Sequence, residues 1–206
     1  MVSDFFATTA DDWTDPTGQL HAYLVPDAAT RERLARAVAA VAHLGYLAPQ
    51  PIDGLHATVQ RFPFLIGELD EATLTQLQES AAASAAGLSP VRLGFGEVVP
   101  TVNSVLTLAT PDDQWAAVVD LARTAAAAAL GDAALHYQPP FGPHITIAYA
   151  TGEGADSDVV AALADAGADG PAGEIVFTEL AWCAVHQNKA EGTYTFETLF
   201  ATPLAG

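Results

Sequence analysis

Hydrophobic residues alternate with polar residues, or run together, in several short segments of this chain. In other segments they recur every three or four residues. The first pattern predicts strands and the second predicts amphipathic helices. We expect strands at residues 20–25, 56–62, 91–98, 105–109, 144–149, 174–186 and 194–199. We expect helices from about residue 28 to 44, 70 to 86, 111 to 130 and 157 to 166.

Capping residues support these helix boundaries. Asp27 can accept a hydrogen bond from the first turn of the first helix. Thr110 and Pro111 have the pattern of a hydroxyl N-cap followed by proline at the first helical position. A glycine follows the expected last turn of each helix, at positions 45, 87, 131 and 167.

The order of the expected elements predicts the fold class. Strands and helices follow one another as β-α-β-α-β-β-α-β-α-β-β, and His56 and His144 lie on the strands after the first and third helices. We therefore expect a duplicated, bilobal α+β fold with two antiparallel sheets and helices on their outer faces. The bare faces of the sheets would meet at a central cleft.

Composition narrows the class of protein. The chain has 206 residues, half of them hydrophobic, which is enough for a sizeable core. We expect residues 1–18 to be an N-terminal arm, with possible anchors at Phe5, Phe6 and Trp13, and residues 19–206 to be a single bilobal domain. Cys183 is the only cysteine, so no intramolecular disulfide can form.

Charge limits the partners. With 25 acidic and 7 basic residues, the net charge is −18, which makes a basic groove for long nucleic acid improbable. A small anionic substrate in a local pocket remains compatible with this charge. Residues 1–15 are acidic and lack the basic and apolar regions of a signal peptide, and no apolar segment approaches about 20 residues. We therefore expect a cytoplasmic protein without membrane contact. We expect a monomer.

Two short strings carry the candidate chemistry: His-Ala-Thr at residues 56–58 and His-Ile-Thr at 144–146. Residues two apart in a strand point to the same face, so each string places an imidazole beside a hydroxyl. One histidine can be neutral while the other is protonated near neutral pH. Two such pairs across a cleft supply a base, an acid and two hydrogen-bond donors. Such a set of groups can carry out phosphoester chemistry without a metal.

The strings His-Ala-Thr-Val and Pro-His-Ile-Thr-Ile resemble the paired motifs of the two-histidine phosphoesterase superfamily, which includes 2′-5′ RNA ligase-like proteins and cyclic phosphodiesterases. The resemblance extends from about Leu20 to Leu199. It implies a bilobal fold with both histidines on the floor of a cleft and no metal or cofactor. It also implies that a 2′,3′-cyclic phosphate is opened, or that 2′-5′ linkages are made and broken. By analogy, His144 is the base, His56 the acid, and Thr58 and Thr146 the donors to the phosphate.

Further residues are candidates for substrate binding. Gln60 would share the face of His56 and Thr58 in a regular strand, where either a phosphate contact or a structural hydrogen bond would be expected. The other candidates are the first-strand residues His21 and Tyr23, the loop aromatics Tyr137 and Phe141, and the late residues His186 and Lys189. The loop aromatics could stack on a base or pack on the lobe. Arg61 is expected on the opposite face.

Three functions that involve nucleotides or RNA fit this sequence, and cyclisation or hydrolysis of a non-nucleotide phosphate is a fourth. The first is a metal-independent phosphodiesterase that acts on a small 2′,3′-cyclic phosphate or a short RNA end. The second is an RNA 2′-5′ ligase or end-processing enzyme. The third is a non-catalytic nucleotide-binding module with the same fold. The spacing of the His and Cys residues suggests no zinc site.

Overall fold

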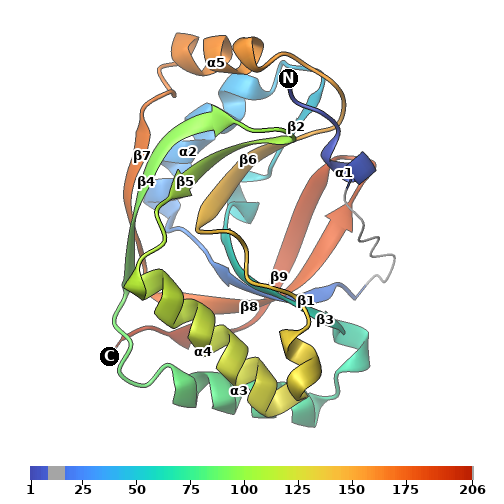
Figure 1. Ribbon diagram of the computed structural model, residues 1–206, viewed down its shortest axis with the longest axis vertical. Helices are drawn as coiled ribbons and strands as arrows, with labels where there is room; N and C mark the ends of the chain where they lie inside the picture. The colour runs from blue at the N-terminus through green and yellow to red at the C-terminus, as the bar shows by residue number, and fades with distance from the viewer. Residues whose placement is uncertain (9–16, 206) are drawn as a thin grey trace.

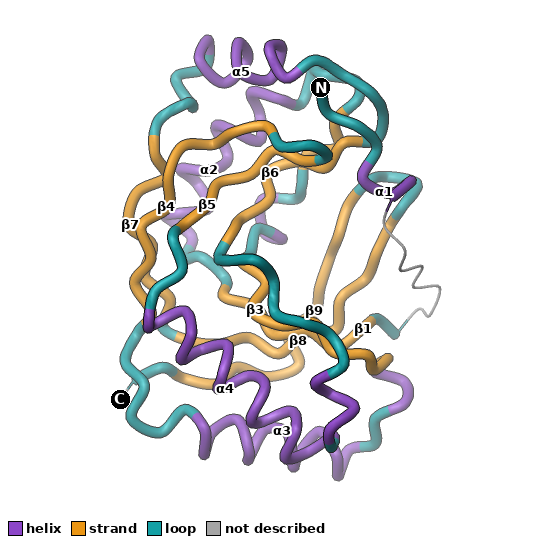
Figure 2. Tube along the Cα trace, viewed as in Figure 1, coloured by secondary structure: helices purple, strands orange, loops and turns teal. Residues whose placement is uncertain are grey.

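The computed structural model describes residues 1–8 and 17–205 (Figures 1 and 2). The expected anchor Trp13 lies outside the described residues. The strands are β1 (Gln19–Leu24), β2 (Leu47–Pro49), β3 (Ala57–Leu65), β4 (Val91–Pro100), β5 (Ser104–Ala109), β6 (His144–Ala150), β7 (Pro171–Phe177), β8 (Glu179–Asn188) and β9 (Thr193–Pro203). The α-helices are α1 (Phe5–Thr8), α2 (Ala28–Val41), α3 (Glu71–Ser84), α4 (Asp113–Leu130) and α5 (Asp156–Asp165). Short 3₁₀ turns are η1 (Ile52–Gly54), η2 (Ile66–Glu68) and η3 (Asp132–Leu135).

Aspartates cap the helices α2, α3 and α4. Asp27 accepts a hydrogen bond from the backbone N–H of Thr30 at 2.7 Å, as expected for the first residue before α2. The expected N-cap Thr110 is wrong, because α4 begins two residues later. Asp112 is its N-cap and accepts from the N–H of Trp115 at 2.9 Å. The Asp112 carboxylate thus provides a partner for a backbone N–H of the first turn that has no partner within the helix.

Three of the four expected glycine stops are confirmed by a positive φ, at Gly87, Gly131 and Gly167. Gly45 does not end the first helix, because α2 stops at Val41. The N–H of Ala42 bonds to the carbonyl of Ala39, and the N–H of Leu44 to that of Val41. These shorter-range bonds turn the chain out of the helix before the glycine is reached.

The described strands form one curled antiparallel sheet in the order β7-β4-β5-β6-β3-β1-β8-β9, with β2 beside β6. The expected mixture of helices and antiparallel strands is confirmed, but the described strands make a single sheet rather than two. Its two parts meet where β3 pairs with β6 through one residue pair, Ala57 with Ile145. We call β7, β4, β5, β6 and β2 the β6 half, and β3, β1, β8 and β9 the β3 half.

Helices cover the outer side of the curled sheet at both ends (Figure 1). Helices α3 and α4 pack against each other; α4 lies on β3 and β4, and α3 on β9. Helices α2 and α5 cover β4, β6 and β7. In the core beneath α3 and α4, the Trp182 ring stacks between Phe62 and Phe200, at centroid distances of 5.6 and 5.7 Å. No described helix is both long and apolar enough to cross a bilayer.

The expected strand at 174–186 is wrong, because the chain forms two strands there. β7 pairs with β4 at one end of the sheet, whereas β8 lies between β1 and β9 near the other end. The break falls at Thr178, whose carbonyl accepts a hydrogen bond from Leu204 at 2.8 Å. Only Thr178 separates the two strands, and no glycine or proline marks the break in the sequence. Strand β2 was also not expected.

The inner face of the β3 half carries a second apolar cluster. Tyr23, Cys183 and Val185 are buried there, and the N-terminal residues Phe5 and Phe6 pack against it. The Phe5 ring lies 4.3 Å from that of Tyr149, on the β6 half. Two of the expected anchors of the N-terminal arm therefore contact both halves of the sheet, through Tyr149 and Tyr194.

A buried glutamine also joins the two halves, next to Tyr194. Gln50 follows β2, and its Nε2 donates to the carbonyls of Ala48 and Gly192 at 3.1 and 3.0 Å. Its Oε1 accepts from the N–H of Tyr194 on β9 at 3.0 Å. Gln50 is 5% exposed, so these groups would have no water to replace the amide.

Replacing Gln50 with leucine should therefore destabilise the protein by about 2–4 kcal/mol, because buried backbone groups lose their partners. Urea unfolding measures this change. The matched control is Gln138→Leu at an exposed position, which should change the free energy of unfolding by less than about 0.5 kcal/mol. Equal stability of the two variants would contradict a structural role for Gln50.

Candidate active site

The two His-x-Thr strings lie side by side at the junction of the halves. Ala57 and Ile145, the middle residues of the two strings, pair directly and are fully buried. The flanking residues His56, Thr58, His144 and Thr146 are partly exposed. Because neighbours along a strand point to opposite faces, all four side chains lie on the inner face, away from the core. The expected sharing of one face is confirmed for both pairs.

Each imidazole is held by a backbone carbonyl two residues before it. The Nδ1 of His56 lies 2.7 Å from the Gly54 carbonyl, and the Nδ1 of His144 lies 2.9 Å from that of Gly142. A carbonyl only accepts, so Nδ1 carries a proton in both rings. Nε2 can then be unprotonated and act as a base, or protonated and act as an acid. Neither Nε2 has a hydrogen-bond partner among the residues that the structure describes.

Each imidazole also stacks on an aromatic ring. Tyr23 lies parallel to His56 at 3.8 Å between centroids, with an interplanar angle of 12°. Phe141 lies parallel to His144 at 4.8 Å and 11°. The edge of Phe196 on β9 completes the surroundings of His56 at 5.5 Å. The rings fix the imidazole planes and remove water from them.

Loss of water lowers the pKa of both histidines. For His56 the pKa falls to about 4, because burial disfavours the charged form and the nearby His144 adds to this effect. The bond to Gly54 acts in the opposite direction. Burial likewise lowers the pKa of His144, opposed by the bond to Gly142. Both rings are therefore neutral at pH 7 in the free protein.

Solved structures with the same arrangement of elements identify the fold. TT0787 of Thermus thermophilus aligns over 91% of this chain and 98% of its own, with a TM-score of 0.70 and 18% identity. E. coli LigT in complex with 3′-AMP aligns over 92% and 99%, with a TM-score of 0.67 and 17% identity. The chain has the fold of the two-histidine phosphoesterases.

A further structure, described as that of a phosphoesterase, aligns with a TM-score of 0.66 and 18% identity over 92% of this chain and 99% of its own. Other E. coli LigT structures hold NADP⁺, ATP or phosphate. No family model and no curated protein matches the sequence. At these identities the likeness concerns the two-histidine phosphoesterase fold alone.

Tyr23 and His21 lie on the inner face, but beneath the site rather than at its surface. They are 2% and 3% exposed. His21 Nδ1 lies 2.9 Å from the Tyr23 hydroxyl, and His21 Nε2 lies 3.1 Å from Gln19 Oε1. Burial lowers the pKa of His21, and the nearby His56 and Arg61 add to this. This buried set supports the stacked Tyr23 ring, so a direct contact with substrate is not expected of it.

The prediction that Gln60 faces the site is wrong. Its Nε2 donates to the carbonyl of Tyr137 at 3.1 Å, and its Oε1 accepts from Arg123 of α4 at 3.1 Å, on the helix-covered side. The cause is a bulge in β3: Tyr23 pairs with Thr58 and Ala22 with Gln60, which leaves Val59 without a partner on β1. The extra residue reverses the faces of the positions that follow.

The same bulge turns Arg61 to the inner face, contrary to expectation. Arg61 pairs with His21 in the register of β1 and β3, and paired residues share a face. Its guanidinium lies 4.3 Å from the centre of the Tyr137 ring. Tyr137 thus belongs to the wall of the inner face. Phe141, at 75% exposure, is available to a planar ligand above His144.

The late candidates are not brought to the histidines. His186 shares a face with Trp182 and Ala184, as expected, but Trp182 belongs to the helix-covered core. His186 therefore lies on the side of β8 opposite the site, so its prediction as a binding residue is wrong. Lys189 lies in the turn between β8 and β9, partly exposed. Its role in binding stays a prediction.

Sequence reasoning missed three supporting residues, Gly54, Gly142 and Tyr149. Gly54 and Gly142 each lie two positions before a histidine, so both strings read Gly-x-His-x-Thr, a repeat visible in the sequence. The hydroxyls of Tyr23 and Tyr149 lie near those of Thr58 and Thr146; burial raises the pKa of both tyrosines, and the threonine hydroxyls oppose this. The residues that the structure describes form no group of three or more His, Cys, Asp or Glu suited to a metal ion.

The stacked ring predicts a measurable pKa change. Tyr23→Leu should raise the pKa of His56 from about 4 toward its ordinary 6.5, because water reaches the imidazole. Tyr23→Phe should keep the low value, since the ring remains. NMR titration of the imidazole C–H signals measures both, with Tyr46→Leu as a control away from the site. A low pKa in the leucine variant would contradict this explanation.

The low pKa also predicts how stability depends on pH. The unfolded chain binds a proton at His56 near pH 6.5, whereas the folded chain does so only near pH 4. Between these values the unfolded state holds more protons, so the contribution of His56 to stability falls as the pH falls from 6.5 to 4. His56→Asn should remove this part of the slope in urea unfolding. His43→Asn, at an exposed position, should not.

Proposed function

We propose that this protein is a phosphoesterase that opens a 2′,3′-cyclic phosphate on a nucleotide or a short RNA end. One observation carries the proposal. Two imidazoles with equivalent Nδ1–carbonyl bonds, each next to a threonine, lie on the partly exposed inner face where β3 pairs with β6. A pair of this kind can provide an acid and a base on opposite sides of one phosphorus atom.

In the proposed reaction, His144 Nε2 accepts a proton from water while the water oxygen bonds to phosphorus. The bond from phosphorus to the ribose 3′ oxygen breaks, and this oxygen takes a proton from His56 Nε2. The product carries a 2′-phosphate, and proton exchange with solvent restores both rings. Thr58 and Thr146 donate hydrogen bonds to the phosphoryl oxygens as their negative charge grows.

The low pKa values fit this reaction once an anion is bound. Both histidines are neutral in the free protein, and an acid is needed. A bound phosphodiester places a negative charge beside the rings, which raises the pKa of an adjacent imidazole. The substrate therefore promotes protonation of one histidine. The buried surroundings then strengthen its interaction with the phosphate.

Substrate size is inferred from charge and aromatic surface. A chain with a net charge of −18 has little means of holding a long polyanion. The exposed Phe141 ring offers a stacking surface for one base beside His144. Structures of the similarly folded E. coli LigT hold 3′-AMP, ATP or NADP⁺, which are all nucleotides. We therefore favour a nucleotide or the last residues of a short RNA.

The test is hydrolysis of the four nucleoside 2′,3′-cyclic phosphates with EDTA present, followed by identification of the product. We expect turnover in the chelator. His56→Ala and His144→Ala should each lower kcat by about 10²–10⁴-fold, the usual contribution of a general acid or base. Thr58→Val and Thr146→Val should reduce it less, and His43→Ala, an exposed control, should leave it unchanged.

Other outcomes would overturn the proposal in defined ways. Nucleotide binding that is unaffected in both histidine variants, with no turnover of any cyclic phosphate, would identify a binding module. Joining of RNA ends in preference to hydrolysis would identify a 2′-5′ ligase. Turnover that stops in EDTA and returns with a metal ion would contradict metal-independent acid–base catalysis.

The pKa directions also predict the pH profile. The acid must be protonated and the base neutral, and both groups have a pKa below 6.5 in the free protein. kcat/KM should therefore peak below pH 6.5 and decline above it. The kcat profile should lie at higher pH, because bound anion raises the pKa. Each single histidine variant should lose one limb of the profile; retention of both limbs would contradict the assigned roles.

A further inference from the structure

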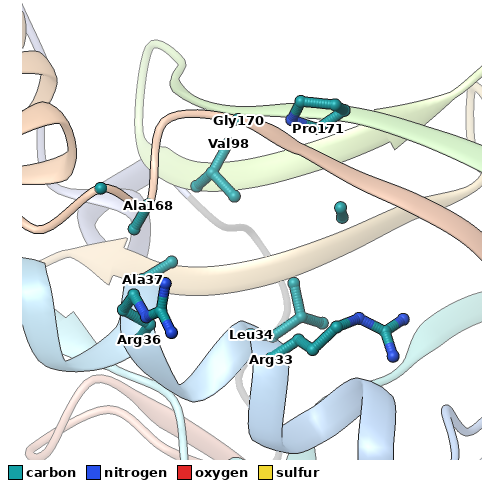
Figure 3. Close-up of a pocket in the computed structure, with 10 residues that line it drawn as sticks. Arg33, Leu34, Arg36, Ala37, Val98, Ala168, Gly170 and Pro171 are labelled. Carbon is teal, nitrogen blue, oxygen red and sulfur yellow. The ribbon is translucent and has the colours of Figure 1, made fainter.

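A cavity of about 270 Å³ lies on the outer side of the β6 half, between α2, β4 and the segment that joins α5 to β7 (Figure 3). Its lining residues come from α2, β4, the segment that joins α5 to β7, and the start of β7. They are Arg33, Leu34, Arg36, Ala37, Val98, Gly167, Ala168, Gly170, Pro171 and Ala172. None of them belongs to the candidate active site. The cavity is therefore a separate feature of the fold.

Two arginines border this cavity in a chain that has few cations. Arg33 and Arg36 are two of the 7 basic residues, against 25 acidic ones. Arg33 donates to the Thr30 hydroxyl at 3.0 Å. Within the described residues, neither guanidinium is within ion-pair distance of a carboxylate. The loop carboxylate of Asp169 does not line the cavity. Hydrogen bonds from Thr30 lower the pKa of the Asp27 carboxylate, and the guanidinium of Arg33 is near enough to help, but Asp27 does not line the cavity. The cavity thus has two guanidinium groups at its border and no carboxylate in its lining.

The rest of the lining is apolar. Leu34 and Ala37 of α2 and Val98 of β4 belong to the buried core, and the small residues Ala168 and Ala172 lie across from them. In Figure 3, Val98 points toward α2, while the two arginine side chains diverge with Leu34 between them. A ligand in this space would contact methyl groups along its middle and a guanidinium toward each end.

We propose that this cavity binds a small organic dianion, whose two anionic groups are separated by a short apolar spacer. Each guanidinium can hold a carboxylate or a phosphate through two parallel hydrogen bonds. The volume is just below the range of about 300–1,000 Å³ typical of drug-sized ligands, which favours a small metabolite. An exposed ion pair alone is weak, so affinity depends on engaging both arginines together with the apolar floor.

Isothermal titration of the full chain with straight-chain dicarboxylates, from malonate to suberate, tests this proposal. We expect the affinity to peak at an intermediate length and to fall as salt is added. Butyrate, with one carboxylate, should bind at least about tenfold more weakly than the best dicarboxylate, because it engages one guanidinium. Arg33→Gln and Arg36→Gln should each remove the length preference and reduce the best affinity to that of butyrate.

Two control variants distinguish binding in the cavity from non-specific attraction of anions to positive charge. Arg31→Gln removes the same charge from the same helix outside the cavity, and should keep the length optimum. Ala172→Leu keeps both arginines but narrows the space, and should weaken the best ligand. Equal affinity at every length, or an equal loss in Arg31→Gln and the cavity variants, would overturn the proposal.

The site is independent of the proposed catalysis. The double variant His56→Ala and His144→Ala should bind the best dicarboxylate as tightly as the natural chain does. Loss of binding in this variant would place the ligand in the active site and overturn the cavity assignment. Failure of the cyclic phosphate assay would leave the cavity result unaffected.

Discussion

The candidate site depends on a single strand contact, the pairing of Ala57 with Ile145. This contact joins the two halves of the sheet and sets both histidine strings on the same face at the same level. Alternation along β3 and β6 then points the two methyl-bearing residues into the core and the reactive side chains out of it. A slip of one residue in either strand would bury an imidazole and expose a core residue.

Burial lowers the pKa of both imidazoles in these positions. Tyr23 and Phe141 each cover one ring face, and the glycine carbonyls fix which nitrogen points outward. The tyrosine itself is supported from below by His21. The chain therefore uses buried polar and aromatic groups to hold two neutral histidines. This arrangement suits a reaction in which the charge that they need arrives with the ligand.

Most elements and the histidine pairs could be predicted from the sequence, because both depend on local alternation and capping. The errors arose at positions whose face in the sheet depends on pairing with strands that are distant in the sequence. The bulge at Val59 exchanged the faces of Gln60 and Arg61, and it is visible only in the pairing of β3 with β1. His186 was placed on the face of Trp182 correctly, but which face was the inner one could not be known before the sheet was assembled. The division at Thr178 has the same origin, since nothing local marks it.

The halves of this molecule are interlocked by their connections. The chain enters β1 in the β3 half, crosses to β2, returns to β3, and crosses again before β4 and before β8. Helix α2 follows β1 yet covers β6 and β7, and α4 follows β5 yet packs on β3. No single cut therefore releases either half as a fragment with all of its own strands. Such a topology favours unfolding as one cooperative unit, and it makes the paired histidines inseparable by truncation or domain exchange.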